Sequence, residues 1–251
     1  MDQTLPAAAT TTDLATEVAP LARRYKRANG PVIRLVNRLG GTLEHQLSAL
    51  PQGVRNQLEK LTAQALEASY GIASRAPDIG TRAPMVAAVA AGAAGGAGGL
   101  ATAVAELPVT VTLFLNTIRS VAREAGLDPD EDWVRAECLQ VFAAGSPLAQ
   151  DDGVNTSFIA SRLALTGSTA QNLIRTIAPR LAAVLGQKLA AQAVPVIGAV
   201  SGAALNAAFL SYYREIARVR FELVKLGHVH GAEAVEAEFR IAVTPPKVIR
   251  A

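Results

Sequence analysis

The stretch that decides the fold is APMVAAVAAGAAGGAGGLATAVAELPVTVTLFLNTI, residues 83–118, in which Glu106 is the single charged residue. Its first part is built almost entirely from alanine and glycine. A second stretch, LAAQAVPVIGAVSGAALNAAFLSYY, covers residues 189–213 and carries no charge. Each is long enough to cross a bilayer, which takes about 20 apolar residues. Because alanine contributes little to membrane insertion, both stretches also suit the interior of a helical domain.

Glycines four residues apart occur in both stretches. On a helix this spacing places them on one face, where the missing Cβ lets a second backbone approach closely. We therefore predict that they are helix-packing positions and that the helices meet inside one domain, with any membrane contact peripheral. The glycines concerned are Gly92, Gly95, Gly96, Gly99, Gly198 and Gly202.

The rest of the chain also has the pattern of helices. Apolar residues recur at helical spacing, and no alternating apolar–polar run marks a strand. The predicted fold class is an all-α, multi-helix bundle built around glycine- and alanine-rich helical hairpins. Pro108 is expected in the first turn of its helix, and the acidic run that starts at Asp128 is expected to cap the next one. Helices are predicted at 82–105, 107–125, 133–143, 157–165, 170–178, 180–192 and 196–226, and another opens near Gln52.

The chain has 251 residues, which suits one large domain with an ample core. Residues 1–20 are predicted to be a disordered tail, 21–240 a single helical domain, and 241–251 a C-terminal tail. The first 20 residues lack the basic start and apolar core of a signal peptide, so we expect a cytoplasmic protein. A lone cysteine, Cys138, forms no internal disulfide and is compatible with that compartment.

Positive charge gathers near the start of the predicted domain. Residues 21–60 hold eight Lys and Arg against two Glu, and the densest part is Arg23, Arg24, Lys26 and Arg27. These four are predicted to contact an anionic surface such as the cytoplasmic leaflet, the alternative being a solvated helix face. Nucleic acid is not an expected partner, because no recognition motif accompanies the cluster and aromatic residues make up only 4% of the chain.

The search for chemistry predicts no catalytic residue, cofactor or metal site. The acids at 128–132 lack the glycine and closing acid of a calcium loop, and His228 and His230 have no third ligand nearby. Glu106 is the exception. The preferred interpretation is a solvent-exposed turn between two helices. The alternative is a buried carboxylate that contacts a ligand or pairs with an arginine, for which the candidates are Arg119, Arg162 and Arg214.

Three blocks of sequence resemble the EcsC family of bacterial proteins. They are AAGAAGGAGGLATAVAELP at 90–108, TLFLNTIRSVAREAGLD at 112–128, and PVIGAVSGAALNAAFLSYYREIARVRF at 195–221. With the helix around Leu50, the resemblance covers about residues 40–226. At Ala125, just before Gly126, an aromatic residue is expected instead. The family is named for a protein encoded beside an ABC-type transporter. The resemblance implies a helical, cytoplasmic or membrane-associated protein with a membrane-linked accessory role, and it transfers no catalytic residue.

Three functions remain open at this point. The first is a non-enzymatic, membrane-associated accessory protein whose partner is an anionic membrane surface or a membrane protein such as a transporter. The second is a helical binding protein for a lipid or other apolar ligand, whose head group would contact Glu106, Arg119 or Arg214. The third is an unrecognised hydrolase, which lacks a recognisable nucleophile–base pair.

Overall fold

Every element in the described part of the computed structural model is a helix, which confirms the predicted all-α bundle. The structure describes residues 11–28, 52–72, 86–88, 90–91, 99–144, 170–192 and 198–244. The predicted helix at 157–165 and the glycines Gly92, Gly95 and Gly96 lie outside these ranges.

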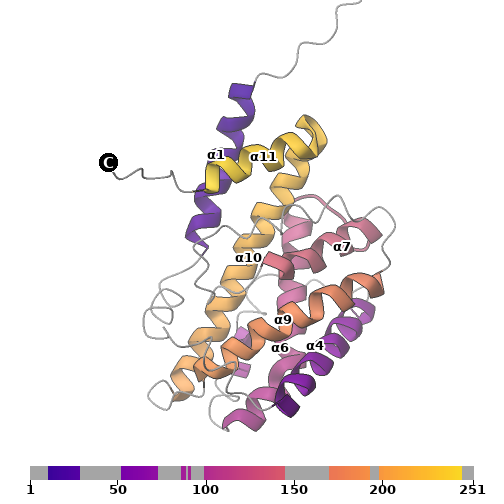
Figure 1. Cartoon of the computed structure of the whole chain (residues 1–251), viewed down its shortest axis with the longest axis vertical. Coiled ribbons are helices and arrows are strands. Elements are labelled where there is room, and N and C mark those ends of the chain that lie inside the picture. Colours follow the sequence, from indigo (N-terminus) through magenta and orange to yellow (C-terminus); the bar gives the residue numbers. More distant parts are fainter. Residues whose placement is uncertain are drawn as a thin grey trace, which may run out of the picture.

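Helix α10, Gly198–His230, is the longest described element and packs against most of the other helices (Figure 1). Along one part of its length it packs against α6, Gly99–Glu124. Near its C-terminal end it packs against α1, Thr11–Arg27, and α11, Ala232–Val243, which also contact each other. Residues from the two ends of the described chain therefore lie side by side at one end of the molecule.

The other end of the molecule is built by α4, Gln52–Ile72, which packs against both α6 and α9, Ala170–Gln192 (Figure 1). Helix α7, Asp132–Gln140, and the short 3-10 helix η1, Val141–Ala144, fill the space beside α9 and α6. Helix α6 therefore lies between α4 and α10.

Aromatic side chains dominate the core where α6, α10 and η1 meet. The Phe114 ring lies 6.5 Å from the Phe209 ring and 5.2 Å from the Tyr213 ring, centroid to centroid. Phe142 reaches Tyr213 at 5.3 Å, edge to face. All four are buried. Offset and edge-to-face pairs add to the free energy gained by burying apolar area, so this contact fixes how α6 crosses α10.

Glycine ends two of these helices. Gly126 has φ 79° and follows α6, where the Leu127 amide donates back to the Ala122 carbonyl at 2.9 Å. Gly231 has φ 87° and separates α10 from α11. Residues with a Cβ rarely adopt this left-handed conformation, so glycine permits both reversals.

The boundaries of the bundle differ from the prediction in three places. Residues 11–20 belong to α1 and are not a disordered tail, because Leu14 and Val18 are buried against the domain. Residues 241–243 are the last turn of α11, where Val243 is buried. The cap expected at Asp128 is also wrong: α7 begins at Asp132, and the Asp128 carboxylate accepts from the Asp130 amide within the preceding loop.

Two prolines lie inside helices that the sequence analysis had divided. Helix α6 runs through Pro108 without a break, and α9 runs through Pro179. A proline removes one helical hydrogen bond, and packing on both sides of α6 compensates for its absence. The predicted hairpin turn at Glu106 is therefore wrong, because Glu106 and Pro108 lie within one helix.

Of the predicted packing glycines, Gly99 and Gly198 are the first residues of α6 and α10, and Gly202 is buried in α10. We expect Gly202→Leu to lower the free energy of unfolding by about 1–3 kcal/mol, because a large side chain must displace its buried surroundings. Gly53→Ala in α4 is the control, since an added Cβ there meets nothing within 4 Å. It should be neutral or slightly stabilising. Thermal unfolding checks both, and an unchanged Gly202→Leu midpoint would contradict the predicted close helix contact at Gly202.

Candidate functional site

A buried carboxylate, Glu106, joins three helices in the interior of the domain. Its Oε1 accepts hydrogen bonds from Asn206 Nδ2 of α10 at 2.6 Å and from Thr110 Oγ1 of α6 at 3.0 Å. Lys188 Nζ of α9 lies 3.4 Å from the same oxygen. The side chains of Glu106 and Lys188 are 6% and 1% exposed. These four residues are called the Glu106 cluster below.

The amide of Asn206 has a fixed orientation. Its Nδ2 donates both to Glu106 Oε1 and to the Ala88 carbonyl, the latter at 2.9 Å. Turning the amide over would place its oxygen against two acceptors, so the nitrogen must face them. Two buried oxygens of the cluster, Glu106 Oε2 and Asn206 Oδ1, then have no hydrogen-bond partner among the described residues. All donors in the cluster converge on one oxygen of the carboxylate.

Burial lowers the pKa of the Lys188 amine below its usual 10.5, and the Glu106 carboxylate beside it opposes part of that shift. Removing a charge from water costs free energy, so the ammonium form is disfavoured unless an anion compensates it. The Glu106 carboxylate is that anion. The pair therefore combines a carboxylate with an amine that releases its proton more readily than an exposed lysine.

The solvent-exposed turn expected at Glu106 is not observed, and its ion-pair partner among the described residues is Lys188 and neither Arg119 nor Arg214. Arg119 lies 13 residues further along the same helix, about 20 Å away at 1.5 Å per residue. It donates instead to the Pro129 carbonyl at 2.9 Å and pairs with Asp130 at 2.7 Å. Arg162 lies outside the described residues. A role of Arg119 or Arg214 in contacting a ligand stays a prediction.

Lys188 and Asn206 were missed by the sequence analysis, although one signal pointed to Lys188. It is the only charged residue between Arg180 and Arg214, as Glu106 is between Arg82 and Arg119. Two lone and opposite charges in two apolar stretches are expected to pair, because either one alone is costly to bury. Asn206 carries no comparable signal in the sequence.

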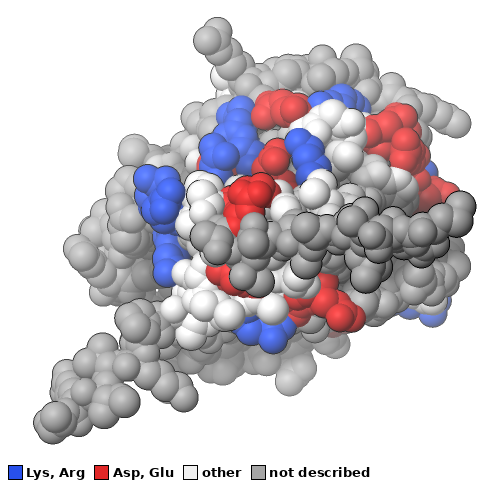
Figure 2. All heavy atoms as spheres, turned by 90° about the horizontal axis from the view of Figure 1, so that it is seen from above, with Lys and Arg blue, Asp and Glu red and all other residues white. Residues whose placement is uncertain are grey.

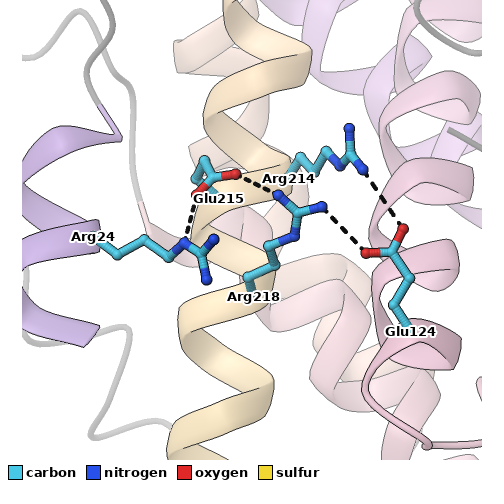
Figure 3. Close-up of polar contacts among 5 residues, drawn as sticks. All are labelled: Arg24, Glu124, Arg214, Glu215 and Arg218. Carbon is cyan, nitrogen blue, oxygen red and sulfur yellow. Dashed lines mark hydrogen bonds and ion pairs between the residues drawn. The ribbon is translucent and has the colours of Figure 1, made fainter. Parts of the chain in front are cut away.

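A second polar feature runs across the surface from α1 to α6 (Figure 3). Arg24 of α1 pairs with Glu215 of α10 at 2.8 Å, and Glu215 also pairs with Arg218 at 2.6 Å. Glu124 of α6 then lies 3.2 Å from Arg218 and 3.6 Å from Arg214. This row of ion pairs links α1 and α6 to α10. Because the side chains are partly exposed, each pair adds little to the free energy of unfolding.

The predicted anionic-surface residues form the end of α1. Arg23, Arg24, Lys26 and Arg27 are all exposed. Lys26 donates to the Ala242 carbonyl of α11 at 3.0 Å, which places the basic end beside Ile241, an apolar side chain that is 70% exposed. Seen from the end of the molecule that carries α1 and α11, acidic and basic side chains alternate over the described surface (Figure 2).

The residues considered for chemistry have separate surroundings. The His228 ring lies 6.0 Å from Trp133, whereas His230 contacts Glu17 at 3.1 Å. Cys138 is buried, and burial raises the pKa of its thiol to about 12, so it stays protonated near neutral pH. Within the described ranges, no group of three His, Cys, Asp or Glu side chains is arranged to hold a metal ion.

Comparison with family models connects the fold to known proteins. The model of the EcsC protein family matches residues 36–223, which is most of the chain. The protein belongs to the EcsC family. All four residues of the Glu106 cluster lie inside the matched region, whereas α1 and α11 lie outside it. Comparisons with curated proteins and with solved structures find no match.

A helix that crosses a bilayer must be both long and apolar. Among the residues that the structure describes, no helix combines the length and the apolar character needed to cross a bilayer.

Proposed function

We propose that this EcsC protein is a non-enzymatic accessory protein that acts at the inner face of the cell membrane, bound peripherally to anionic lipid and to a membrane protein such as a transporter. The observation that carries the proposal is the exposed Ile241 beside the basic end of α1. An exposed apolar side chain flanked by cations is the combination by which peripheral proteins bind anionic bilayers.

The cations differ in how available they are to a membrane. Arg24 is already paired with Glu215, and Lys26 donates to a backbone carbonyl. Arg23 and Arg27 are exposed and four residues apart, so they share one face of α1. Each basic residue near an anionic surface contributes about 1 kcal/mol to binding. These two arginines are therefore the main electrostatic contacts in the proposal.

Binding to vesicles tests the proposal directly. Neutralising both arginines, as Arg23→Gln/Arg27→Gln, should weaken binding to phosphatidylglycerol-rich vesicles about 30-fold, which corresponds to about 2 kcal/mol. The matched control is Lys60→Gln/Arg175→Gln, which removes two exposed cations from α4 and α9. It should bind like the wild type. Cosedimentation measures both, and high salt should release the wild type because it screens exposed charges.

Two outcomes would count against this function. If the wild type binds phosphatidylcholine and phosphatidylglycerol vesicles equally, the basic end of α1 plays no part. If both double variants lose the same affinity, the effect comes from net charge and not from α1. Ile241→Asn adds a further check, because it should weaken binding without changing the salt dependence.

A second candidate function, binding of a lipid or another apolar ligand inside the bundle, is favoured by a different observation. Within the described part of the chain, two buried acceptor oxygens of the Glu106 cluster have no donor. This candidate does not depend on membrane contact, and the two functions are compatible in one protein.

A further inference from the structure

Two large apolar side chains are exposed close together where the start of α7 meets the end of α10. Trp133 of α7 is 43% exposed, and Val229 of α10 is 75% exposed. The Trp133 ring lies 6.0 Å from the ring of His228, the residue before Val229. Single apolar residues are common on protein surfaces, whereas neighbouring ones that include a tryptophan are typical of protein-binding sites.

The Trp133 ring has a fixed orientation at this surface. Its indole N–H donates to the Glu131 carboxylate, and the His228 ring meets it edge to face. A side chain that is already ordered loses little further conformational entropy when a partner binds. The adjacent carboxylate adds to the negative potential of the ring, whose face attracts a lysine or an arginine.

The loop before α7 and the first residue of that helix are acidic. Their exposed acids are Asp128, Asp130, Glu131 and Asp132. Asp130 pairs with Arg119, and Asp132, which is 98% exposed, lies 3.8 Å from Arg135. Neither Asp128 nor Glu131 pairs with a cation in the part of the chain that the structure describes. The surface around Trp133 is therefore negative, and it complements a positively charged partner.

This surface is separate from the basic end of α1. Helices α7 and α1 lie on opposite sides of α10 (Figure 1). Val229 precedes α11 and Ile241 lies in its last turn, so the 12 residues of α11, about 18 Å of helix, separate the two. An anionic bilayer is repelled by the acids beside Trp133. The chemistry of this surface thus favours a protein as its partner and not a membrane.

We infer that Trp133, Val229 and the acids at 128–132 form a docking surface for a lysine- or arginine-rich protein segment that also carries apolar side chains. This inference rests on the proposed function and deepens it, because it gives the chemistry of the membrane-protein partner. Cytoplasmic loops of membrane proteins carry an excess of Lys and Arg, which suits this surface. The cations contact the acids and the Trp133 face, and the apolar side chains contact Val229.

Trp133 is the only tryptophan of the chain, so its fluorescence reports on this surface. The full chain is titrated, without lipid, with a tryptophan-free peptide of repeated Lys-Leu-Leu-Lys units. The emission of Trp133 should shift to the blue and become less accessible to acrylamide, and added salt should weaken binding. A peptide with glutamate in place of lysine should give no shift. One with serine in place of leucine should bind about tenfold more weakly.

Charge variants test the role of the acids. Glu131→Gln/Asp132→Asn should weaken binding of the Lys-Leu-Leu-Lys peptide about tenfold, because it removes two exposed ion pairs. The matched control is Glu59→Gln/Glu67→Gln, which removes two exposed carboxylates from α4 and should bind like the wild type. Fluorescence anisotropy of a labelled peptide measures both, so that no result depends on the emission of Trp133.

An apolar variant tests the other half of the surface. Val229→Asn should weaken binding of the same peptide and leave its salt dependence unchanged. Val109→Asn is its control, because Val109 is also exposed but lies on α6, about 25 Å of helix before Gly126. It should keep the wild-type affinity.

Several results would overturn the inference. An unshifted Trp133 emission, or equal binding of the lysine and glutamate peptides, would show that the acids select no cation. An equal loss in both charge variants would assign the effect to net charge. A blue shift on concentrating the protein alone, which Arg23→Gln/Arg27→Gln removes, would assign the surface to a second copy of the chain. Because no lipid is present, failure here leaves the vesicle test of α1 intact, and failure of that test leaves peptide binding measurable.

Discussion

Replacing Lys188 with methionine is expected to lower the free energy of unfolding by about 3–5 kcal/mol, because it leaves the Glu106 carboxylate buried without its cation. Methionine has a similar length and is apolar, so the change removes charge with little change in packing. The nitrogen lies 3.4 Å from Glu106 Oε1, and both side chains are buried. Chemical denaturation at neutral pH measures the loss.

The pH dependence of this effect has a definite sign. Burial keeps the pKa of Lys188 below 10.5 in the folded protein, whereas unfolding returns it to that value. Between the two pKa values the unfolded chain binds more protons than the folded one. The free energy of unfolding of the wild type therefore increases as the pH rises, which is a gain in stability. Lys188→Met lacks this gain. The difference between wild type and variant should therefore grow as the pH rises toward 10.5.

Comparing the two proteins removes the contributions of other groups. Burial raises the pKa values of Tyr212, Tyr213 and Cys138, which lowers stability in alkaline solution in both proteins alike. The double variant Glu106→Gln/Lys188→Met removes both charges and should be more stable than Lys188→Met alone. A double variant that is less stable than either single one would refute the pairing.

The helical class could be predicted from the sequence because it depends on local patterns. The residues of α4 show apolar spacing near 3.6, and the observed helix covers Gln52–Ile72. Pro108 and Pro179 misled the prediction, since proline is common at helix starts as well as breaks. Their tolerance inside α6 and α9 depends on packing against other helices, which a single sequence does not display.

Helix α1 was missed for a related reason. Its exposed face carries charged and polar residues, and its buried face consists of few apolar positions, among them Leu14, Val18 and Ala22. A window dominated by threonine, alanine and acids is typical of a tail. The helix is stabilised by α10 and α11, which lie about 200 residues away in the chain. Long-range packing of this kind overrides local propensity.

The candidate site could also be predicted only in part, because it too depends on long-range packing. Glu106 stood out as a lone charge, but whether it faces water or the core is decided by Lys188 and Asn206, which are 82 and 100 residues away. That Glu106 Oε2 and Asn206 Oδ1 have no donor among the described residues follows from the geometry of three helices and has no signature in composition. The basic end of α1 was visible as a charge run, whereas the position of Ile241 beside it required the fold.

Removing the acid of the second buried ion pair should also destabilise the fold, but with a different dependence on pH. Glu137 of α7 accepts from Arg220 of α10 at 2.6 Å, and both side chains are buried. We expect Glu137→Met to lower the free energy of unfolding by about 3–5 kcal/mol, because it leaves the guanidinium in the core without this carboxylate. Chemical denaturation measures the loss. Glu124→Gln is the control, and it should cost less than about 1 kcal/mol because its pairs are partly exposed.

The two buried pairs differ in how the remaining charge can respond. An arginine keeps its proton at every pH at which the protein folds, whereas a buried lysine can release it. The loss in Glu137→Met should therefore stay nearly constant from neutral to moderately alkaline pH, in contrast to the growing difference expected for Lys188→Met. Removing Glu106 should likewise cost less than removing Glu137, because only Lys188 can become neutral. A loss in Glu137→Met that disappears with rising pH would mean that Arg220 is not the group left charged.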